Sequence, residues 1–180
     1  MSEGSDRERA SEDDEGGEHS SHGSDEIDDL RTIADYQFGA GAGDALFRDA
    51  AGVRIERTTS GRPQQIHVEA GRLVSFGTDG RYTLGLEGGR RLQDALDHPA
   101  YRVVVGDESE PFVRDGRNVF SKFVTVAGAE IRAGDEVLVV HEDGHLLAVG
   151  RAELDGPSIL EFETGMAVAV RSAVGPATED

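Results

Sequence analysis

Short runs of β-type sequence, each ended by a turn dipeptide, follow one another through most of this 180-residue chain. Residues 52–58 alternate apolar and charged side chains, and Ser60-Gly61, Ala70-Gly71, Asp79-Gly80 and Asp143-Gly144 punctuate the later runs. A period of two predicts strands, and these dipeptides are typical of tight turns between antiparallel strands. We therefore expect small sheets. No stretch approaches the 18 apolar residues of a membrane span, so we expect no membrane partner.

The runs fall into two groups. In the first, the pattern predicts strands at residues 52–58, 65–68, 73–76 and 82–86, then a short helix at 87–97 that ends before Pro99. In the second, it predicts strands at residues 101–105, 136–140, 145–154 and 166–171, a turn or short helix at 115–119 followed by another strand, and a helical link at 157–162. Such turn-separated strands favour a small barrel or pseudobarrel. The expected fold class is α+β, mainly β, with a small α/β domain ahead of a β-pseudobarrel.

Acidic residues are concentrated at the N-terminus. The first 30 residues hold 12 acids and two arginines, which gives this segment a net charge of −10 out of −18 for the chain. Such a segment buries too little apolar surface to offset the entropy of ordering it, so residues 1–30 are expected to be a disordered acidic tail. We interpret it as a solvating tail rather than an acidic interaction arm. Residues 174–180 are likewise expected to be flexible.

The next two segments link the tail to the first strands. Ile27, Leu30, Ile33 and Ala34 have helical spacing and predict a short amphipathic helix over residues 27–38. The glycine-rich run at residues 39–44 lacks the Gly-Lys-Ser/Thr ending of a phosphate-binding loop. We expect it to be a flexible connection.

Composition excludes several kinds of site. There is no cysteine, so a disulfide framework, a thiolate nucleophile and a cysteine zinc site are excluded. The acidic, polar N-terminus does not look like a secretory signal, and a cytoplasmic location is expected. Only one of the 18 basic residues is lysine, which together with the excess of acid indicates a halophilic organism. At molar salt the Debye length is about 3 Å, so net negative charge does not exclude a nucleic-acid partner there.

Residues 101–172 resemble a PUA domain, a module named for pseudouridine synthases and archaeosine transglycosylases. The resemblance rests on VVVGDESEPFVRDGRNVFSKFV, then IRAGDEVLVVHEDGHLLAVGRAEL, and finally EFETGMAVAVR. The preceding part, with ADYQFGAGAGDALF and LGLEGGRRL, is similar to the small domain before PUA in archaeal tRNA-guanine transglycosylases. The resemblance implies domains at residues 31–98 and 99–173. The catalytic TIM barrel of that family needs about 250 residues, and no part of this chain resembles it.

The resemblance implies that the second domain binds structured RNA along its first short helix, the following strand and its last strand. The residues carried over are Arg114, Gly116, Arg117, Asn118, Phe120, Ser121, Lys122 and Arg171. Arginine suits phosphate contacts, asparagine can contact a base edge or a 2′-OH, and either Phe120 or Phe123 could stack on a base. The alternative is that Arg114 and Arg117 only form surface ion pairs with nearby acids, which are common and weak.

Other polar groups give weaker signals. His141 and His145 flank the Asp143-Gly144 turn without an evident third ligand, so no metal site is expected. Arg90 and Arg91 are interpreted as a solvated pair. No constellation suggests catalysis, so we expect no catalytic residue, no cofactor and no enzyme activity.

Two functions follow from the resemblance. The first is a non-catalytic RNA-binding protein that recognises tRNA or another structured RNA, rather than DNA, and assists tRNA modification, namely archaeosine formation by guanine exchange in the D arm. The second is an obligate structural subunit that docks on a separate tRNA-guanine transglycosylase catalytic chain. An exposed apolar patch on residues 45–97 would favour the subunit.

Overall fold

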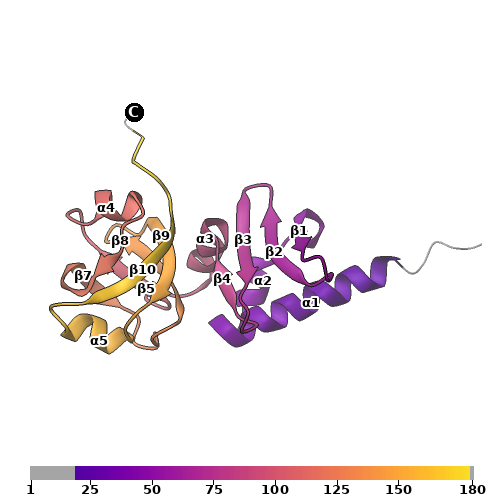
Figure 1. Ribbon diagram of the computed structural model, residues 1–180, viewed down its shortest axis with the longest axis horizontal. Coiled ribbons are helices and arrows are strands. Elements are labelled where there is room, and N and C mark those ends of the chain that lie inside the picture. Colours follow the sequence, from indigo (N-terminus) through magenta and orange to yellow (C-terminus); the bar gives the residue numbers. More distant parts are fainter. Residues whose placement is uncertain (1–18, 179–180) are drawn as a thin grey trace, which may run out of the picture.

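A computed structural model describes residues 19–178, which form two units side by side along the long axis of the molecule (Figure 1). The first unit contains a four-stranded antiparallel sheet in the order β1-β2-β3-β4. Its strands are β1 (Arg54–Arg57), β2 (Pro63–Val68), β3 (Gly71–Phe76) and β4 (Tyr82–Leu84). Helices α1 (His19–Phe38) and α2 (Ala42–Leu46) and the 3₁₀ turn η1 (Ala50–Gly52) precede the sheet, and α3 (Leu86–Ala95) follows it.

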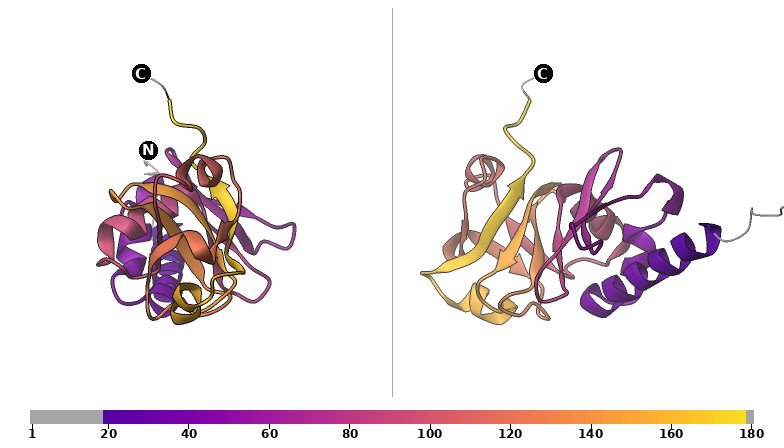
Figure 2. Two further views of the ribbon diagram at one scale, coloured as in Figure 1. Left: turned by 90° about the vertical axis from the view of Figure 1, so that its left-hand side faces the viewer. Right: turned by 45° about the vertical axis from the view of Figure 1, so that its right-hand side comes forward.

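The second unit is a six-stranded sheet in the order β6-β10-β9-β8-β5-β7, in which β5 and β8 are the parallel pair. Its strands are β5 (Arg102–Val105), β6 (Val119–Phe120), β7 (Val124–Ala127), β8 (Glu136–His141), β9 (Leu146–Ala152) and β10 (Met166–Ala173). The connections include α4 (Glu110–Arg114), η2 (Ser121–Phe123) and α5 (Gly156–Glu161). The strongly curved sheet confirms the predicted α+β class with a strand-rich, barrel-like second part (Figure 2).

Helix α1 corrects the prediction for the N-terminal segment. The helix begins at His19, so residues 19–30 are helical rather than a disordered tail, while residues 1–18 lie outside the described part of the chain. Ile27 and Leu30 are buried in the core of the first unit together with Ala34 and Phe38. This apolar stripe has the spacing that predicted a helix over residues 27–38, and packing against the sheet extends the ordered segment beyond what composition indicates.

The glycine-rich run is not a flexible connection. Gly41 has a left-handed φ of 92° and precedes α2, which brings α2 back against α1. The backbone N–H of Gly43 donates to Asp35 Oδ1 over 2.7 Å, and a Cβ on Gly43 would lie 2.3 Å from the carbonyl oxygen of Arg31. The glycine therefore permits a close helix–helix contact.

Helix α3 joins the two units through a shared core. Leu92 on α3 is fully buried in one hydrophobic cluster with Leu138, Val140 and Val149 of the second sheet. Arg91 is also buried and donates to the carbonyl of Leu46 over 2.9 Å, so Arg90 and Arg91 are not a solvated pair. The two units are thus fixed against each other by packing as well as by the chain.

A buried carboxylate crosses the same junction. Glu136 at the start of β8 accepts a hydrogen bond from the backbone N–H of Leu84 in the first unit. The same carboxylate binds Arg171 of β10 through two hydrogen bonds of 2.6 and 2.7 Å. No helix in the described part of the chain is long and apolar enough to cross a membrane.

Candidate functional site

Helix α4 positions the predicted site residues. It spans Glu110–Arg114 and is followed by a turn at residues 115–116, where the sequence predicts a turn or short helix over residues 115–119. Pro111 in its first turn needs no backbone donor there, which favours helix initiation. Gly116 ends it with φ 85°, and the N–H of Arg117 donates back to the carbonyl of Phe112 over 3.0 Å. This is the Schellman arrangement of a helix C-terminus, and it turns Arg117 outward.

An apolar cleft lies beside this helix end. It has a volume of about 260 Å³ and is lined mainly by Phe112, Val113, Arg117, Asn118, Val119, Phe120 and Phe123. Phe112 and Phe120 are 55% and 45% exposed, which is unusual for large aromatic side chains. Phe123 is half-buried and faces the same cleft. The cleft thus offers aromatic surfaces to a flat, apolar ligand group.

Two predicted cations lie at the cleft or next to it. The Arg117 guanidinium lies 5.7 Å from the centre of the Phe112 ring and 3.9 Å from the nearest Asp115 oxygen. The Lys122 ammonium lies 4.8 Å from the centre of the Phe123 ring. Arg117 keeps 68% of its side-chain exposure, and Lys122 is exposed. Both groups can bind an anionic ligand without breaking a contact to a buried acidic side chain.

Asn118 makes a structural contact, and Ser121 is buried. The Oδ1 atom of Asn118 accepts a hydrogen bond from the N–H of Val170 over 3.0 Å, which ties the loop after α4 to β10. Ser121 is 3% exposed, and its hydroxyl is buried without a hydrogen-bond partner. A ligand in the cleft therefore meets Asn118 more readily than Ser121.

Arg114 and Arg171 form hydrogen bonds with other groups of the protein, away from the cleft. Arg114 donates to Glu110 Oε1 over 2.7 Å and also contacts His145 Nε2 and the carbonyl of Gly175. Arg171 is held by the buried Glu136 carboxylate. The sequence motif predicts that these two arginines bind RNA together with Arg117, but their contacts separate them from the cleft.

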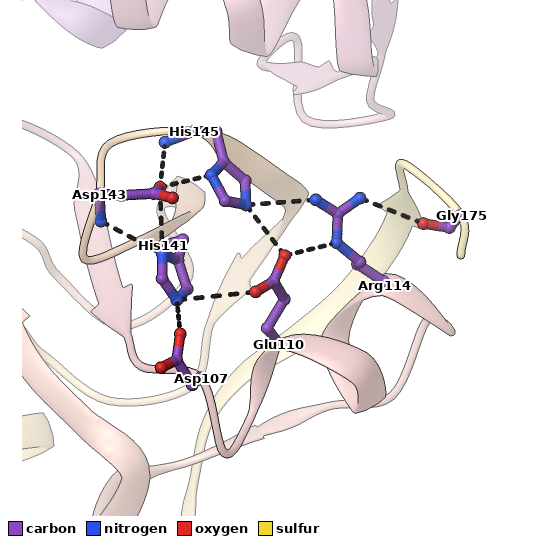
Figure 3. A network of polar contacts seen from close by, with 7 residues as sticks. All are labelled: Asp107, Glu110, Arg114, His141, Asp143, His145 and Gly175. Atoms are coloured by element: carbon purple, nitrogen blue, oxygen red, sulfur yellow. Dashed lines mark hydrogen bonds and ion pairs between the residues drawn. The ribbon is translucent and has the colours of Figure 1, made fainter. Parts of the chain in front are cut away.

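A second polar cluster, which contains a histidine pair, lies beside α4 (Figure 3). The rings of His141 and His145 are stacked with centres 4.9 Å apart. Glu110 Oε1 lies 3.0 Å from His145 Nε2, and Glu110 Oε2 lies 3.6 Å from His141 Nε2. Asp107 adds a contact of 2.8 Å to His141 Nε2. The third group near the two histidines therefore comes from α4, a separate element, and sequence spacing gave no sign of it.

The pKa values of Glu110, Asp143 and His141 in this cluster are shifted from their ordinary values. Hydrogen bonds from Arg114 and His145 lower the pKa of the Glu110 carboxyl. The backbone N–H of His145 and the His141 ring lower the pKa of Asp143. Burial disfavours the charged form of His141, but hydrogen bonds to Asp143 and Asp107 outweigh it and raise the pKa of that imidazole. The carboxylates thus create a strongly cation-favouring environment.

Comparison with known families assigns the two units separately. Residues 28–99 match the family described as patch-forming domain C2 of tRNA-guanine transglycosylase. Residues 101–174 match the PUA domain. Both matches agree with the resemblance seen in the sequence motifs.

Curated relatives support the same relationship. The chain is 47% identical over 146 residues to the tRNA-guanine(15) transglycosylase of Pyrococcus furiosus, and this aligned region covers 81% of this chain and 24% of the relative. It is 44% identical over 149 residues to the enzyme of that name from Methanothermobacter thermautotrophicus, covering 82% and 22%. The chain therefore spans about a quarter of the length of the curated relatives it matches.

Solved structures share the fold of the chain. A hypothetical protein of Pyrococcus horikoshii OT3 superposes with a TM-score of 0.65 at 22% identity, over 83% of this chain and 90% of that one. A conserved PUA domain protein from Thermoplasma acidophilum gives a TM-score of 0.57 at 17% identity, over 84% and 89%. The arrangement of a small domain followed by the curved sheet thus recurs in other archaeal proteins.

Proposed function

This chain belongs with the proteins that carry a C2 domain of tRNA-guanine transglycosylase followed by a PUA domain, and from that premise we propose that it binds tRNA. The proposed role is non-catalytic: the second unit recognises the RNA, and the chain assists tRNA modification in the archaeosine pathway. The names of its relatives, tRNA-guanine(15) transglycosylases, support tRNA as the RNA.

The observation that carries this proposal is the aromatic cleft beside α4. Phe112 and Phe120 present ring surface to solvent, and Arg117 stands at the end of the helix with its charge exposed. Single-stranded RNA ends and loops are recognised by stacking on aromatic rings or guanidinium planes and by contacts to base edges and phosphates. An unstacked base fits the cleft, while Arg117 and Lys122 are placed for phosphates.

The proposed contact set is accordingly narrower than the one expected from the motif. It retains Arg117, Asn118, Phe120 and Lys122 and adds Phe112. Gly116 acts through the backbone by ending α4. Arg114, Ser121 and Arg171 are assigned to folding contacts because their polar groups are engaged or buried in the protein.

The test is a mobility-shift titration with intact tRNA, tRNA lacking its 3′ end, and an unrelated hairpin. Phe120→Ala should weaken tRNA binding about tenfold, since one base–aromatic stack is worth about 1–3 kcal/mol. Arg117→Glu should weaken it further, whereas Arg54→Glu, at an exposed position on β1 in the other unit, is the matched control. Binding that is equal for all three RNAs, or unchanged in both cleft variants, would contradict the proposal.

A second candidate is a structural subunit that docks on a separate transglycosylase catalytic chain. Tyr36 on α1 favours it, because this large aromatic side chain is 96% exposed. Among the described residues, however, the large exposed hydrophobic side chains are Tyr36, Phe112, Phe120, Leu160 and Phe162, and residues 45–97 contribute none of them. Gel filtration with an archaeal transglycosylase, comparing the wild type with Tyr36→Ser, distinguishes this candidate: the subunit requires a complex that the substitution weakens.

A further inference from the structure

We propose that Glu110, His141 and His145 form a binding site for a divalent transition-metal ion, represented experimentally by Zn²⁺. One ligand atom from each residue lies within 4.8 Å of the other two. The three residues come from α4, the end of β8 and the residue just before β9 (Figure 3). Imidazole nitrogens and carboxylate oxygens are the ligands that Zn²⁺ takes in proteins without cysteine.

The orientation of the two imidazoles is the second observation. Asp143 Oδ1 contacts the Nδ1 atom of His141 at 3.0 Å and also contacts Nδ1 of His145. The backbone N–H of Asp143 donates to His141 Nδ1 over 3.2 Å, and both Nε2 atoms face Glu110 (Figure 3). Metal binding therefore requires each Nε2 to lose its proton, and the Asp143 carboxylate is placed to accept a hydrogen bond from Nδ1 of each ring in that state. Metal-binding histidines almost always donate their other nitrogen to such a carboxylate or to a carbonyl, which fixes the tautomer and the ring orientation.

Charge also favours a cation at this point. Three carboxylates, those of Asp107, Glu110 and Asp143, surround the two imidazoles, and Arg114 is bonded to one of them, Glu110. With neutral imidazoles these groups sum to −2, which a divalent ion compensates. Asp107 Oδ1 lies 2.8 Å from His141 Nε2, and its largely exposed side chain is free to supply a fourth ligand.

Metal binding requires a small rearrangement. Tetrahedral bonds of about 2.0–2.2 Å place neighbouring ligand atoms about 3.4 Å apart, so separations of up to 4.8 Å must close by up to about 1.4 Å. Arg114 must also give up its 3.2 Å contact with His145 Nε2, while its 2.7 Å bond to Glu110 Oε1 can persist and orient that carboxylate. The exposed side of His145 allows both movements.

The site would connect two parts of the second unit. Glu110 lies one turn before the end of α4, whose Phe112 lines the aromatic cleft, while both histidines belong to the β8–β9 hairpin. A bound ion would hold α4 against this hairpin. Metal binding at this cluster does not depend on RNA binding.

The test uses the full-length chain treated with a chelator and then desalted. Zn²⁺ is titrated in competition with a chromophoric chelator, and the thermal midpoint is recorded with and without the ion. One Zn²⁺ per chain and a raised midpoint are expected. His145→Ala and Glu110→Gln should weaken binding more than tenfold, and Asp143→Asn should weaken it about 10–100-fold through the two imidazoles.

Three controls keep the result interpretable. His67→Ala removes a histidine of the first unit and should leave the affinity unchanged. The double substitution His19→Ala, His22→Ala removes the N-terminal histidines and should also have no effect. His145 is 39% exposed at its side chain, so His145→Ala is expected to fold, and a retained circular dichroism spectrum checks this. Absence of saturable binding, or binding lost only in the His19/His22 variant, would overturn the proposal.

Discussion

Glu136→Gln tests whether the buried carboxylate at the junction stabilises the protein. Glu136 is 5% exposed and accepts from three donors, the N–H of Leu84 and two nitrogens of Arg171. A glutamine can still accept from Leu84, but it loses the charge and places an amide nitrogen near the donors of Arg171. The substitution therefore removes the ion pair while keeping side-chain volume.

Glu136→Gln is expected to lower the free energy of unfolding by about 2 kcal/mol. A hydrogen bond to a charged group contributes about 1.5–3 kcal/mol, and losing one partner of a fully buried pair costs about 3–5 kcal/mol. The side chain of Arg171 is 33% exposed, so water can hydrate it after the substitution, and the loss of stability is expected at the lower end of this range. For a chain of this size, about 2 kcal/mol corresponds to a fall in Tm of about 4–8 °C.

Urea unfolding followed by circular dichroism measures this effect, since the chain has no tryptophan to report by fluorescence. Arg171→Ala and the double variant complete a double-mutant cycle, and a coupling free energy above about 1 kcal/mol is expected. Arg171→Ala should also leave tRNA affinity within twofold, because the guanidinium is held by Glu136. A loss of less than about 0.5 kcal/mol for Glu136→Gln, with no coupling, would refute the reasoning.

Three further predictions follow from other contacts. Gly43→Ala should destabilise the protein by about 1–3 kcal/mol in urea unfolding, since its Cβ would meet the Arg31 carbonyl at 2.3 Å, whereas Gly23→Ala, with open space around it, should be neutral or stabilising. Asp155 accepts from Ser158 N at the start of α5, and this hydrogen bond lowers its pKa, so its contribution to stability is present above the unfolded-state pKa and is lost as pH falls through the folded one. Asp155→Ala should therefore lower the thermal midpoint near neutral pH and have less effect at acidic pH, with Asp155→Asn as the capping control. The logarithm of the tRNA association constant should fall with log salt concentration with a slope of about −2 or shallower, because only Arg117 and Lys122 are proposed for phosphates.

The succession of strands along the chain could be predicted from the sequence to a large extent. Turn dipeptides such as Asp79-Gly80 and Asp143-Gly144 mark the ends of strands locally, so the pattern alone predicts β3, β4, β8 and β9. The beginning of α1 could not be predicted, because residues 19–26 are polar. They precede an apolar stripe whose burial depends on distant strands.

The polar networks were predicted less well, since each combines residues that are far apart in the chain. Glu110 reaches His145 across 35 positions, and Arg171 reaches Glu136 across the same distance. A motif identifies residue types at these positions but not which partner each one meets. Arg114, three residues before Arg117, differs from it because α4 directs one guanidinium toward the histidine pair and the other toward solvent.

The difference between the engaged Arg114 and the exposed Arg117 affects how an acidic protein can bind RNA. The chain carries a net charge of −18, so association gains little from long-range attraction, and two exposed cations release few counterions. Stacking on Phe112 and Phe120 does not depend on ionic strength in this way. Affinity built on the aromatic cleft, with Arg117 and Lys122 selecting the position of the backbone, would therefore persist in a salt-rich environment, where a surface that relied on many exposed cations would release its RNA.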